Sequence, residues 1–573
     1  MAQKASQNKT TKKTVDKPWF KFYPKGVPRT IDYQKVSLPD GFHKTVAEFP
    51  NNKALTYMGK VITFAQLGDM VDRFATAMAD LGVKKGSRVA TLLPNIPQMV
   101  IAYYGAMTAG ASLVLNNPLY TDRELEHQLN DSESEYLVTL DLLAPRMIAL
   151  KPKTKVKKII ICHINDYLPF PKKQLFPHVK KGMFVKIEPS PDIYEFLDLI
   201  KSHKPNPPQV KIGFEDLATF QYTGGTTGLS KGVMLTQSNL SCNLQQIRAW
   251  FPTFERGKEI QMGILPFFHS FGMTAVMNLS MWMGWNVVLV PRPEPLAILE
   301  AINQYKPTFM AAVPTMFVGM LRHPDVKKYS LSTLKGCFSG AAPLAMETIK
   351  EFEATTGAQI CEAYGLSETS PAATINPFGG KTKVGSIGLP IPDTDIKIVD
   401  LDTGKKEMKV GEPGEVIIKG PQVTKGYYQK PEETKTAIRD GWLYTGDIGI
   451  MDEEGYIFIV DRKKDMIIAG GYNIYPRDID EVLFEHPKVA EGCAIGVPDP
   501  YRGETVKVFV VLKEGQTATA EEIINFCKEK LAAYKVPRIV EFIPSLPKSA
   551  VGKILRKELR QMEMEKMAKE KNK

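Results

Sequence analysis

Hydrophobic residues near the start of the chain recur at intervals of three or four positions. They predict an amphipathic helix and comprise Leu67, Met70, Phe74, Met78 and Leu81. Thr63 and Gln66 have the spacing of a capping box, whose reciprocal hydrogen bonds begin a helix, and Gly82 supplies the glycine that commonly ends one. We therefore expect a helix between Thr63 and Gly82.

Short apolar runs follow this helix and alternate with further helical stretches. The runs are RVATLL, SLVLN and YLVTL, and Thr121 with Glu124 forms another capping box before the last of them. Such an alternation is typical of an α/β fold, in which helices cover both faces of a mostly parallel sheet. The sequence therefore predicts a large N-terminal domain of doubly wound, mixed sheets.

Residues 261–291 contain no Asp, Glu, Lys or Arg. A helix needs about 20 consecutive apolar residues to cross a bilayer, but Pro266, His269 and Gly284 interrupt this segment. The segment ends in NVVLV, a branched apolar run that is typical of a buried parallel strand. We expect a buried helix that leads into a buried strand.

The pattern weakens between about Pro145 and Phe214, where prolines, lysines and isolated aromatic residues dominate. One interpretation is a basic insertion at the surface, over about 145–214, with solvated lysines. The other is a basic, aromatic patch that rests on an anionic membrane, to which each lysine contributes on the order of 1 kcal/mol. Charge alone does not decide between them.

After Val384 the chain consists of short strands separated by glycines, such as DIKIVD, GEVIIKG and GYIFIV. They predict a small β-barrel-like subdomain over about 384–461, at the end of an N-terminal domain that covers 19–461. From 462 to 573 strands and helices mix again, which predicts a small α+β C-terminal domain. The lysine-rich residues 1–18 predict a disordered tail.

Composition excludes several classes of protein. The 573 residues are 43% apolar and 24% charged, which is ordinary for a globular chain of several domains. The net charge of +11 is concentrated in the two ends and in 151–186. No nucleic-acid recognition motif accompanies this charge, so we expect no nucleic-acid partner. Six scattered cysteines without a C-x-x-C pair, and the lack of a signal peptide, favour the cytoplasm.

The segment YTGGTTGLSKG, from Tyr222 to Gly232, has the composition of a phosphate-binding loop. Glycines let backbone N–H groups approach a polyphosphate, and threonine hydroxyls add donors. In a Walker A loop the lysine directly follows the last glycine and precedes Ser or Thr. Here Lys231 lies three residues beyond Gly228 and precedes Gly232, so the Walker interpretation fails on spacing.

This loop is one of eight motifs that together resemble the adenylate-forming superfamily of acyl-CoA synthetases, adenylation domains and luciferases. The other motifs follow in the family's order: PFFHSFG (266–272), VPT (313–315), SGAAPL (339–344), YGLSETSP (364–371), GWLYTGDIG (441–449), DRKKDMIIAGGYNIYP (461–476) and PKSAVGKILR (547–556). The opening KPWFKFYPKGVPRTIDY and the segment GYNIYPRDIDEVL look most like bacterial long-chain fatty acid CoA ligases.

The resemblance implies a two-step ligase that uses a fatty acid, ATP, Mg²⁺ and coenzyme A. The carboxylate attacks the α-phosphorus of ATP and expels pyrophosphate, and the thiol of coenzyme A then displaces AMP. It also implies a homodimer. The cysteine usage and the basic insertion lead us to expect a protein in the cytoplasm, or one peripheral on the inner face of the membrane. Three alternatives stay open: a medium-chain or aryl acid substrate, acyl transfer to a carrier protein, and a nucleotide-gated lipid-binding protein without turnover.

The motifs carry over the family's catalytic and nucleotide-binding residues. By resemblance, Thr223 and Glu368 hold Mg²⁺, Lys553 reaches the α-phosphate, and His269 separates the ATP side from the acyl side. The implied ATP and AMP site comprises Thr223, Gly224, Gly225, Thr226, Thr227, Gly228, Lys231, Gly340, Ala341, Ala342, Glu362, Ala363, Tyr364, Gly365, Ser367, Asp447, Arg462, Lys464 and Lys553. Within it, Asp447 would accept both ribose hydroxyls. Gly340, Ala341 and Ala342 would form a backbone strip that lines the adenine, on which Tyr364 would stack.

The resemblance also implies an acyl pocket and a mobile C-terminal domain. The pocket would be lined by Phe267, Phe268, His269, Phe271 and Met273, whose apolar surface suits a hydrocarbon chain. Lys553 must leave the site before the thiol can reach the acyl carbonyl. The family achieves this by a rotation about a hinge, here Lys464, which brings the coenzyme A residues Gly470, Gly471 and Tyr472 into place.

Overall fold

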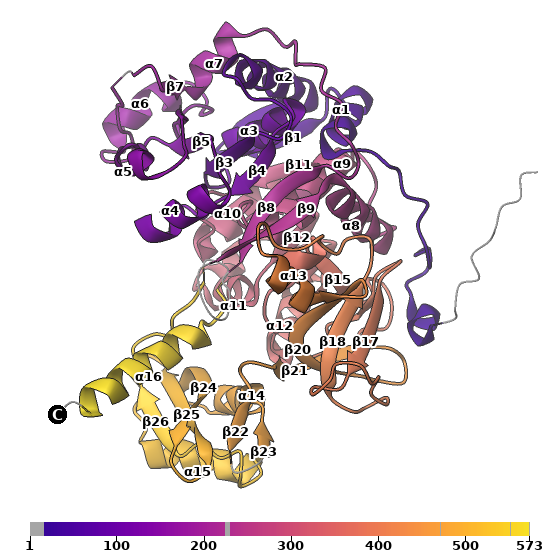
Figure 1. Ribbon diagram of the computed structural model, residues 1–573, viewed down its shortest axis with the longest axis vertical. Coiled ribbons are helices and arrows are strands. Elements are labelled where there is room, and N and C mark those ends of the chain that lie inside the picture. Colours follow the sequence, from indigo (N-terminus) through magenta and orange to yellow (C-terminus); the bar gives the residue numbers. More distant parts are fainter. Residues whose placement is uncertain (1–16, 189, 224–229, 470–471, 550–551, 572–573) are drawn as a thin grey trace, which may run out of the picture.

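The alternating helices and strands of the first third build a sheet of seven strands in the order β7-β6-β5-β3-β4-β8-β9. The computed structural model describes residues 17–188, 190–223, 230–469, 472–549 and 552–571 (Figure 1). Neighbouring strands run parallel, except that β8 and β9 are antiparallel. The bounds are β3 Arg88–Leu92, β4 Ser112–Leu115, β5 Tyr136–Leu140, β6 Lys158–Cys162, β7 Ile193–Glu195, β8 Leu217–Thr223 and β9 Lys231–Thr236.

A second sheet has nine strands in the order β16-β15-β14-β13-β12-β10-β11-β1-β2. Its middle, from β14 to β1, is parallel, and antiparallel strands close both edges. The bounds are β1 Lys53–Tyr57, β2 Lys60–Thr63, β10 Ile260–Gly263, β11 Asn286–Leu289, β12 Phe309–Ala312, β13 Gly336–Ser339, β14 Gln359–Gly365, β15 Ala372–Ile375 and β16 Leu389–Pro390. The predicted mixed, doubly wound architecture is confirmed.

Helices cover these two sheets (Figure 1). Both predicted capping boxes are present, at Thr63 before α2 and at Thr121 before α4. The helices of this part are α1 Leu38–Glu48, α2 Phe64–Asp80, α3 Pro97–Thr108, α4 Asp122–Asp131, α5 Ala144–Leu150, α6 Lys172–Val179, α7 Phe196–Ser202, α8 Gln237–Trp250, α9 Leu279–Met283, α10 Pro295–Tyr305, α11 Pro314–Arg322 and α12 Met346–Thr356. Short turns of other helix types are η1 Pro18–Phe22, η2 Lys151–Lys153, η3 Gly272–Asn278, η4 Val326–Lys328 and η5 Ser367–Thr369.

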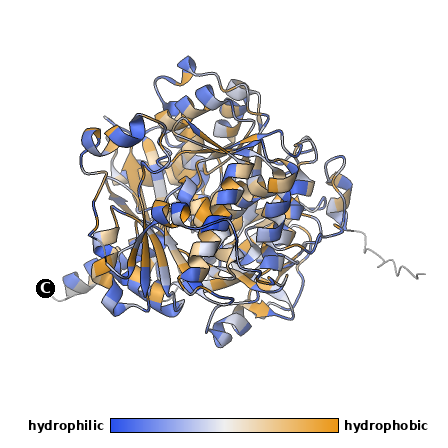
Figure 2. Ribbon diagram, turned by 90° about the horizontal axis from the view of Figure 1, so that it is seen from above, coloured by the Kyte–Doolittle hydropathy of each residue, from blue (hydrophilic) through white to orange (hydrophobic). Residues whose placement is uncertain are grey.

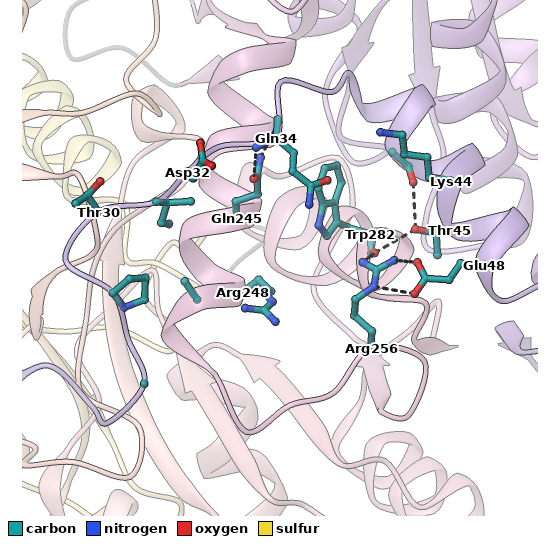
Figure 3. Close-up of a pocket in the computed structure, with 15 residues that line it drawn as sticks. Thr30, Asp32, Gln34, Lys44, Thr45, Glu48, Gln245, Arg248, Arg256 and Trp282 are labelled. Carbon is teal, nitrogen blue, oxygen red and sulfur yellow. Dashed lines mark hydrogen bonds and ion pairs between the residues drawn. The ribbon is translucent and has the colours of Figure 1, made fainter. Parts of the chain in front are cut away.

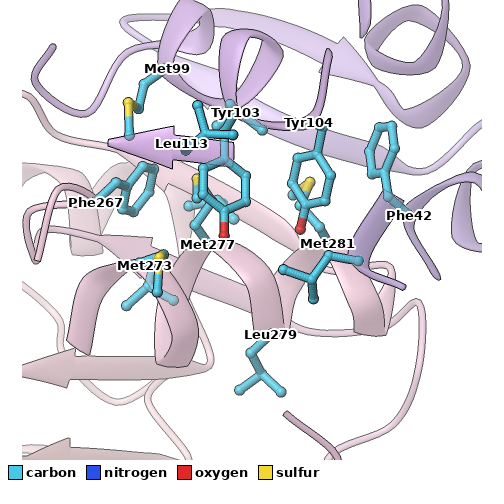
Figure 4. Packing of buried hydrophobic residues seen from close by; sticks show 14 of the residues in the cluster. Phe42, Met99, Tyr103, Tyr104, Leu113, Phe267, Met273, Met277, Leu279 and Met281 are labelled. Atoms are coloured by element: carbon cyan, nitrogen blue, oxygen red, sulfur yellow. The ribbon is translucent and has the colours of Figure 1, made fainter. Parts of the chain in front are cut away.

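The charge-free segment forms a buried helix followed by strand β11, as the sequence predicts. Its first part, η3, is a π-helix, a form that occurs often at functional sites. Tyr103 and Tyr104 of α3 lie against Met277 and Met281 of this helix (Figure 4). Asn278 satisfies both phenols, since Tyr104 donates to its Oδ1 at 2.9 Å and its Nδ2 donates to the Tyr103 hydroxyl at 3.1 Å. Among the described residues, no helix is both long and apolar enough to cross a bilayer.

Two smaller sheets of five strands follow in the chain. The first is antiparallel and contains β17 Asp395–Val399, β18 Gly414–Lys419, β19 Ile438–Arg439, β20 Trp442–Met451 and β21 Ile457–Arg462, with helix α13 Pro431–Ala437. The second contains β22 Ile467–Ala469, β23 Tyr472–Ile474, β24 Val489–Asp499, β25 Gly503–Leu512 and β26 Ile539–Phe542, with helices α14 Pro476–Glu485, α15 Ala520–Lys530 and α16 Arg556–Lys571. Figure 2 shows hydrophobic residues concentrated on the central strands and hydrophilic residues on the outer helices.

The segment 145–214 is more than a surface insertion. Its strand β6 is buried between β5 and β7, so the segment supplies two strands of the first sheet. The isoleucine run KIIIC is the part of the sequence that indicates this buried strand, but prolines and lysines on both sides obscure the pattern. The stretch around α6 matches the expected exposed, lysine-rich surface, as do parts of 151–157 and 201–211.

His163, at the end of β6, fastens this stretch to the sheet. Its Nδ1 lies 3.0 Å from Asp141 Oδ2, and its Nε2 lies 3.0 Å from Glu195 Oε2. The ring also stacks on Phe184 at 4.7 Å. Burial opposes protonation, but the hydrogen bonds to Asp141 and Glu195 outweigh it and raise the pKa of His163 to about 10. The folded protein therefore contains a histidinium at neutral pH.

The charge of His163 makes its contribution to stability dependent on pH. A pKa raised from 6.5 to about 10 means that the contribution is complete below pH 6.5 and is lost as pH rises toward 10. We expect His163→Gln to lower the free energy of unfolding by about 1–3 kcal/mol at pH 6.5. Melting temperatures of both proteins, measured from pH 6.5 to 10, should converge. His203→Gln is the matched control, because His203 lies 3.4 Å from a single carboxylate, that of Asp80. A difference in melting temperature between the original protein and His163→Gln that stays constant with pH would contradict the charge assigned to His163.

Candidate active site

Three predicted nucleotide-binding segments lie where strands end. Thr223 is the last residue of β8, Gly340 follows β13 directly, and Gly365 ends β14. In open α/β sheets, ligands bind beyond the carboxyl ends of the strands. Seven predicted residues lie outside the described part of the chain: Gly224, Gly225, Thr226, Thr227, Gly228, Gly470 and Gly471.

Asp447 is the centre of the predicted ribose site. It lies in β20 directly opposite Arg462 in β21. Arg462 Nε donates to Asp447 Oδ1 at 2.8 Å, and the hydroxyl of Tyr364 donates to Asp447 Oδ2 at 2.6 Å. The Asp447 side chain is only 6% exposed. Because each carboxylate oxygen can accept a further hydrogen bond, this oriented carboxylate suits two ribose hydroxyls.

Lys553 reaches this cluster from the C-terminal part of the chain. Gly552, with φ +72°, precedes it, and a Cβ there would lie 2.8 Å from Thr315 Oγ1, so the turn packs against the start of α11. Loss of hydration, followed by repulsion from Arg462, lowers the pKa of Lys553 to about 8. Part of the residue remains exposed to solvent. Lys553 therefore lies beside the ribose cluster and remains mainly charged at neutral pH.

His269 is a neutral hydrogen-bond donor and not a cation. Burial, followed by the charge of Lys553, lowers the pKa of His269 to about 4. The backbone N–H of Phe271 donates to His269 Nδ1 at 3.3 Å. Since Nδ1 accepts, the proton of the neutral ring is on Nε2. The electrostatic influence of Lys553 also shows that these two predicted catalytic residues lie at one site.

Glu368, in η5, has a partner that the motifs do not contain. The hydroxyl of Tyr427 donates to Glu368 Oε1 at 2.8 Å. Burial raises the pKa of Glu368 above its ordinary value despite this hydrogen bond. Tyr427 reaches Glu368 because its segment pairs with β9, where Val233 and Tyr427 form an isolated bridge. The aromatic pair in TKGYYQKPEE is the signal that could have drawn attention to it.

Lys231, predicted to bind phosphate, has a protein partner in this structure. Its ammonium pairs with Glu433 of α13 and lies 5.3 Å from the ring centroid of Tyr427. Thr223 lies directly across from Lys231 in the β8–β9 ladder. The structure therefore links the base of the glycine-rich loop to Glu368 through Lys231 and Tyr427.

The predicted adenine strip contains unusual backbone positions. Ala341 has φ +70°, a conformation that is uncommon for residues other than glycine and is found at functional sites. A Cβ on Gly365 would lie 1.8 Å from the carbonyl oxygen of Pro371, so only glycine fits there. A Cβ on Gly340 would lie 3.0 Å from Phe271. Ala342, the third member of the strip, is half-buried, as is Ala363, another residue predicted for the nucleotide site.

Two further predicted residues have structural contacts. Glu362 accepts backbone N–H bonds from Leu344 at 3.3 Å and from Gly385 at 3.4 Å, and burial raises its pKa. These contacts make Glu362 a support for the loops around the adenine strip. The Ser367 hydroxyl lies 3.4 Å from that of Ser270, which joins η5 to the FFHSFG motif.

The side chains predicted to line the acyl pocket are buried or half-buried. Phe267, Phe271 and Met273 are buried in the main core, and Phe268 packs against it. Met273 and Met277 continue this lining along the π-helix (Figure 4). Methionine side chains are flexible and adapt to irregular spaces.

The predicted hinge lies in a turn between two sheets. Lys464 lies in the turn between β21 and β22 and is exposed. Partial loss of hydration, followed by repulsion from Arg462, lowers the pKa of Lys464. Its neighbour Asp465 accepts a hydrogen bond from Arg560 of α16 at 2.7 Å. Tyr472 is 56% exposed and stacks on Tyr534 at 4.7 Å, within the C-terminal sheet region.

A surface groove of about 680 Å³ lies elsewhere, between the N-terminal segment 26–34, α1 and α8 (Figure 3). Arg256 in this groove donates to Glu48 and to the carbonyl of Trp282. None of the predicted catalytic, nucleotide-binding or acyl-pocket residues that the structure describes lines this groove. The groove is therefore separate from the site around Asp447 and Lys553.

The residues present fit a magnesium ion that is shared with phosphate. No group of three or more His, Cys, Asp or Glu side chains in the described ranges could hold a metal by itself. Mg²⁺ in phosphate-transferring sites is held by one or two protein oxygens, with phosphate oxygens and water as its other ligands. The half-buried Glu368 carboxylate and the Thr223 hydroxyl are donors of this kind.

Family models match most of the chain. The AMP-binding enzyme model matches residues 42–428, and the AMP-binding enzyme C-terminal domain model matches residues 478–553. The chain is 47% identical over 552 residues to a long-chain-fatty-acid–CoA ligase of Bacillus subtilis, covering 96% of this chain and 98% of the relative. It is 40% identical over 554 residues to the enzyme of that name in Escherichia coli O157:H7, covering 95% and 98%.

Solved structures agree with the sequence comparisons. The anthranilate CoA ligase AuaEII in complex with anthranoyl-AMP superposes with a TM-score of 0.83 and 26% identity, covering 94% of this chain and 98% of that chain. ATP-bound MatB from Rhodopseudomonas palustris gives a TM-score of 0.80 and 28% identity, covering 92% and 99%. These matches confirm the resemblance predicted from the motifs. The chain belongs to the AMP-binding enzyme family of adenylate-forming enzymes, and within it to the group of bacterial long-chain-fatty-acid–CoA ligases.

Proposed function

We propose that the protein activates a fatty acid, preferably a long-chain one, with ATP and transfers the acyl group to coenzyme A. The observation that supports this most directly is the meeting of Lys553 with Asp447 and Arg462 at one edge of the large domain. Extensive similarity to ligases of this name supports the long-chain substrate. The products are acyl-CoA, AMP and pyrophosphate.

In the first half-reaction, the substrate carboxylate attacks the α-phosphorus, the acyl-oxygen–phosphorus bond forms and pyrophosphate leaves. Asp447 and Arg462 hold the ribose, and the ammonium of Lys553 offsets the charge of the carboxylate and the α-phosphate in the transition state. Mg²⁺, held by Glu368 and Thr223, would neutralise charge on the phosphates. The Nε2–H of His269 would donate a hydrogen bond to a ligand oxygen where the phosphates of ATP meet the carboxylate of the fatty acid.

In the second half-reaction, the thiol of coenzyme A displaces AMP from the acyl carbonyl. We propose that residues 462–573 rotate about Lys464, because Lys553 otherwise blocks the approach of the thiol. The exposed turn at Lys464 between two separate sheets supports this boundary. Tyr472, with Gly470 and Gly471, would then line the channel of the pantetheine arm.

Three further proposals concern the setting of the enzyme. A cytoplasmic location is supported by six free cysteines, all buried. Peripheral contact of the stretch around α6 with an anionic membrane is supported by its exposed lysines. A homodimer is supported by the family resemblance alone.

A single assay tests the proposed reaction. Pyrophosphate release and thioester formation are measured with palmitate, acetate, an aryl acid or no acid, each with and without coenzyme A. We expect palmitate to give the largest pyrophosphate release and a thioester only with coenzyme A. The proposal fails if none of these acids stimulates pyrophosphate release. A preference for the aryl acid would favour the alternative of an aryl acid substrate.

Lys553→Ala should separate the two half-reactions. Loss of the ammonium at the α-phosphate should slow adenylation by about 10²–10³-fold, as for removal of one preorganised donor to a transition state. Conversion of a supplied acyl-adenylate to acyl-CoA should stay within a few-fold of the original protein. Lys548→Ala, at a lysine that pairs with Glu491 in the same motif, is the control. Equal losses in both half-reactions would contradict the role assigned to Lys553.

Tyr427→Phe should weaken magnesium use without removing a predicted ligand. The variant loses the 2.8 Å hydrogen bond that orients Glu368. Loss of such a support typically weakens metal binding by about 10–100-fold, so the Mg²⁺ concentration for half-maximal pyrophosphate release should rise accordingly. Tyr428→Phe is the neighbouring control, because that hydroxyl donates to Glu133 instead. An unchanged Mg²⁺ requirement in Tyr427→Phe would exclude this positioning role.

A further inference from the structure

A corner of the first sheet presents large apolar side chains to solvent. Phe170 is 83% exposed, Val179 is 69% exposed and Leu175 is 51% exposed. Leu175 and Val179 are four residues apart in α6, so they share one side of that helix. Large apolar side chains gathered in this way mark interaction surfaces in soluble proteins.

The same corner carries an uncompensated positive charge. Between Phe170 and Lys181 the sequence has four lysines and no acidic residue. Within the described ranges, no carboxylate forms an ion pair with Lys172, Lys180 or Lys181. Apolar groups flanked by free lysines are complementary to a bilayer with anionic headgroups, since the lysines meet phosphates while the apolar groups enter the interface.

The corner is firmly attached to the fold. Phe176 of the same helix is buried in the main core, so α6 is packed against the rest of the domain. Asn165 Nδ2 donates to the carbonyl of Lys173 at 3.1 Å, and the Tyr57 hydroxyl donates to the carbonyl of Ile164 at 2.9 Å. Together with the His163 contacts, these bonds hold the apolar groups outward, so little conformational entropy is lost when they insert.

A second segment joins the corner only in the folded chain. The turn between β1 and β2 contains Met58, which is 44% exposed. A Cβ on its neighbour Gly59 would lie 4.0 Å from Pro169, the residue before Phe170. The apolar surface therefore comes from two segments about one hundred positions apart in the sequence.

We propose that Met58, Phe170, Leu175 and Val179, with Lys172 and Lys180, form a face that docks on an anionic lipid bilayer. We name it the α6 face. This inference rests on the proposed peripheral membrane contact and assigns it to particular side chains. Figure 1 shows α6 at the opposite end of the molecule's long axis from α14, α15 and β26. Docking through the α6 face would therefore leave the C-terminal part free to move.

Vesicle flotation tests the α6 face directly. The full chain is mixed with vesicles of phosphatidylcholine alone, or of phosphatidylcholine and phosphatidylglycerol in equal amounts. We expect binding to the anionic vesicles that weakens as salt rises, because salt screens the lysines. Equal binding to both kinds of vesicle, or binding to neither, would overturn the proposal. Binding to neither would indicate that the α6 face binds another protein instead.

Paired variants separate the apolar from the charged contribution. Phe170→Ser/Leu175→Ser and Lys172→Gln/Lys180→Gln should each weaken binding to anionic vesicles by roughly tenfold or more, and the lysine pair should also flatten the salt dependence. Lys409→Gln/Val410→Ser is the matched control, since Val410 is 59% exposed in the connection between β17 and β18, away from α6. If both test variants bind like the control, the α6 face is not the docking site.

Activity is measured separately, with decanoate as a monomeric acid and no vesicles. All three variants should keep the rate of the unmodified protein, which also shows that they are folded. Vesicle binding without any ligase activity would contradict the proposed function and leave the α6 face standing. Ligase activity without vesicle binding would contradict the α6 face alone.

Discussion

The pairing of β20 with β21 is the constraint on which the site depends. It sets Asp447 directly opposite Arg462, and the 2.8 Å bond between them orients a carboxylate that is almost fully buried. The same strand β21 leads into the turn at Lys464 and so begins the C-terminal part of the chain. One ladder therefore fixes the position of Asp447, the proposed ribose-binding group, and the start of the segment that carries Lys553, the proposed catalytic lysine.

Electrostatics within the site favour an anionic ligand. Lys553 lies near Arg462 and Lys464, and the repulsion among these cations contributes to its lowered pKa. The same positive field, together with burial, keeps His269 neutral. A polyphosphate would relieve this repulsion, since its negative charge stabilises every cation around it. A site that is strained by like charges in its free state is suited to binding ATP.

Local sequence patterns predicted the capped helices correctly. They missed elements whose structure depends on contacts with distant parts of the chain. The capping boxes at Thr63 and Thr121 need only residues three positions apart, so both helices began as expected. Strand β6 lies in a stretch dominated by lysine and proline, and only its pairing with β5 and β7 makes it part of the sheet. The π-helical form of η3 also escaped the sequence pattern, because a buried apolar segment shows no periodicity.

The sequence by itself determined the family and its class of chemistry, because the eight motifs occur in the family's order, and from them come the residues that we propose meet the nucleotide. Tertiary structure alone decided which residues support those groups. Tyr427 and Glu368 are 59 positions apart, and they meet only because the segment of Tyr427 pairs with β9. Gly552 likewise meets Thr315 through the packing of two distant segments. Such contacts arise from the summed packing of whole sheets, and no local spacing of residues encodes them.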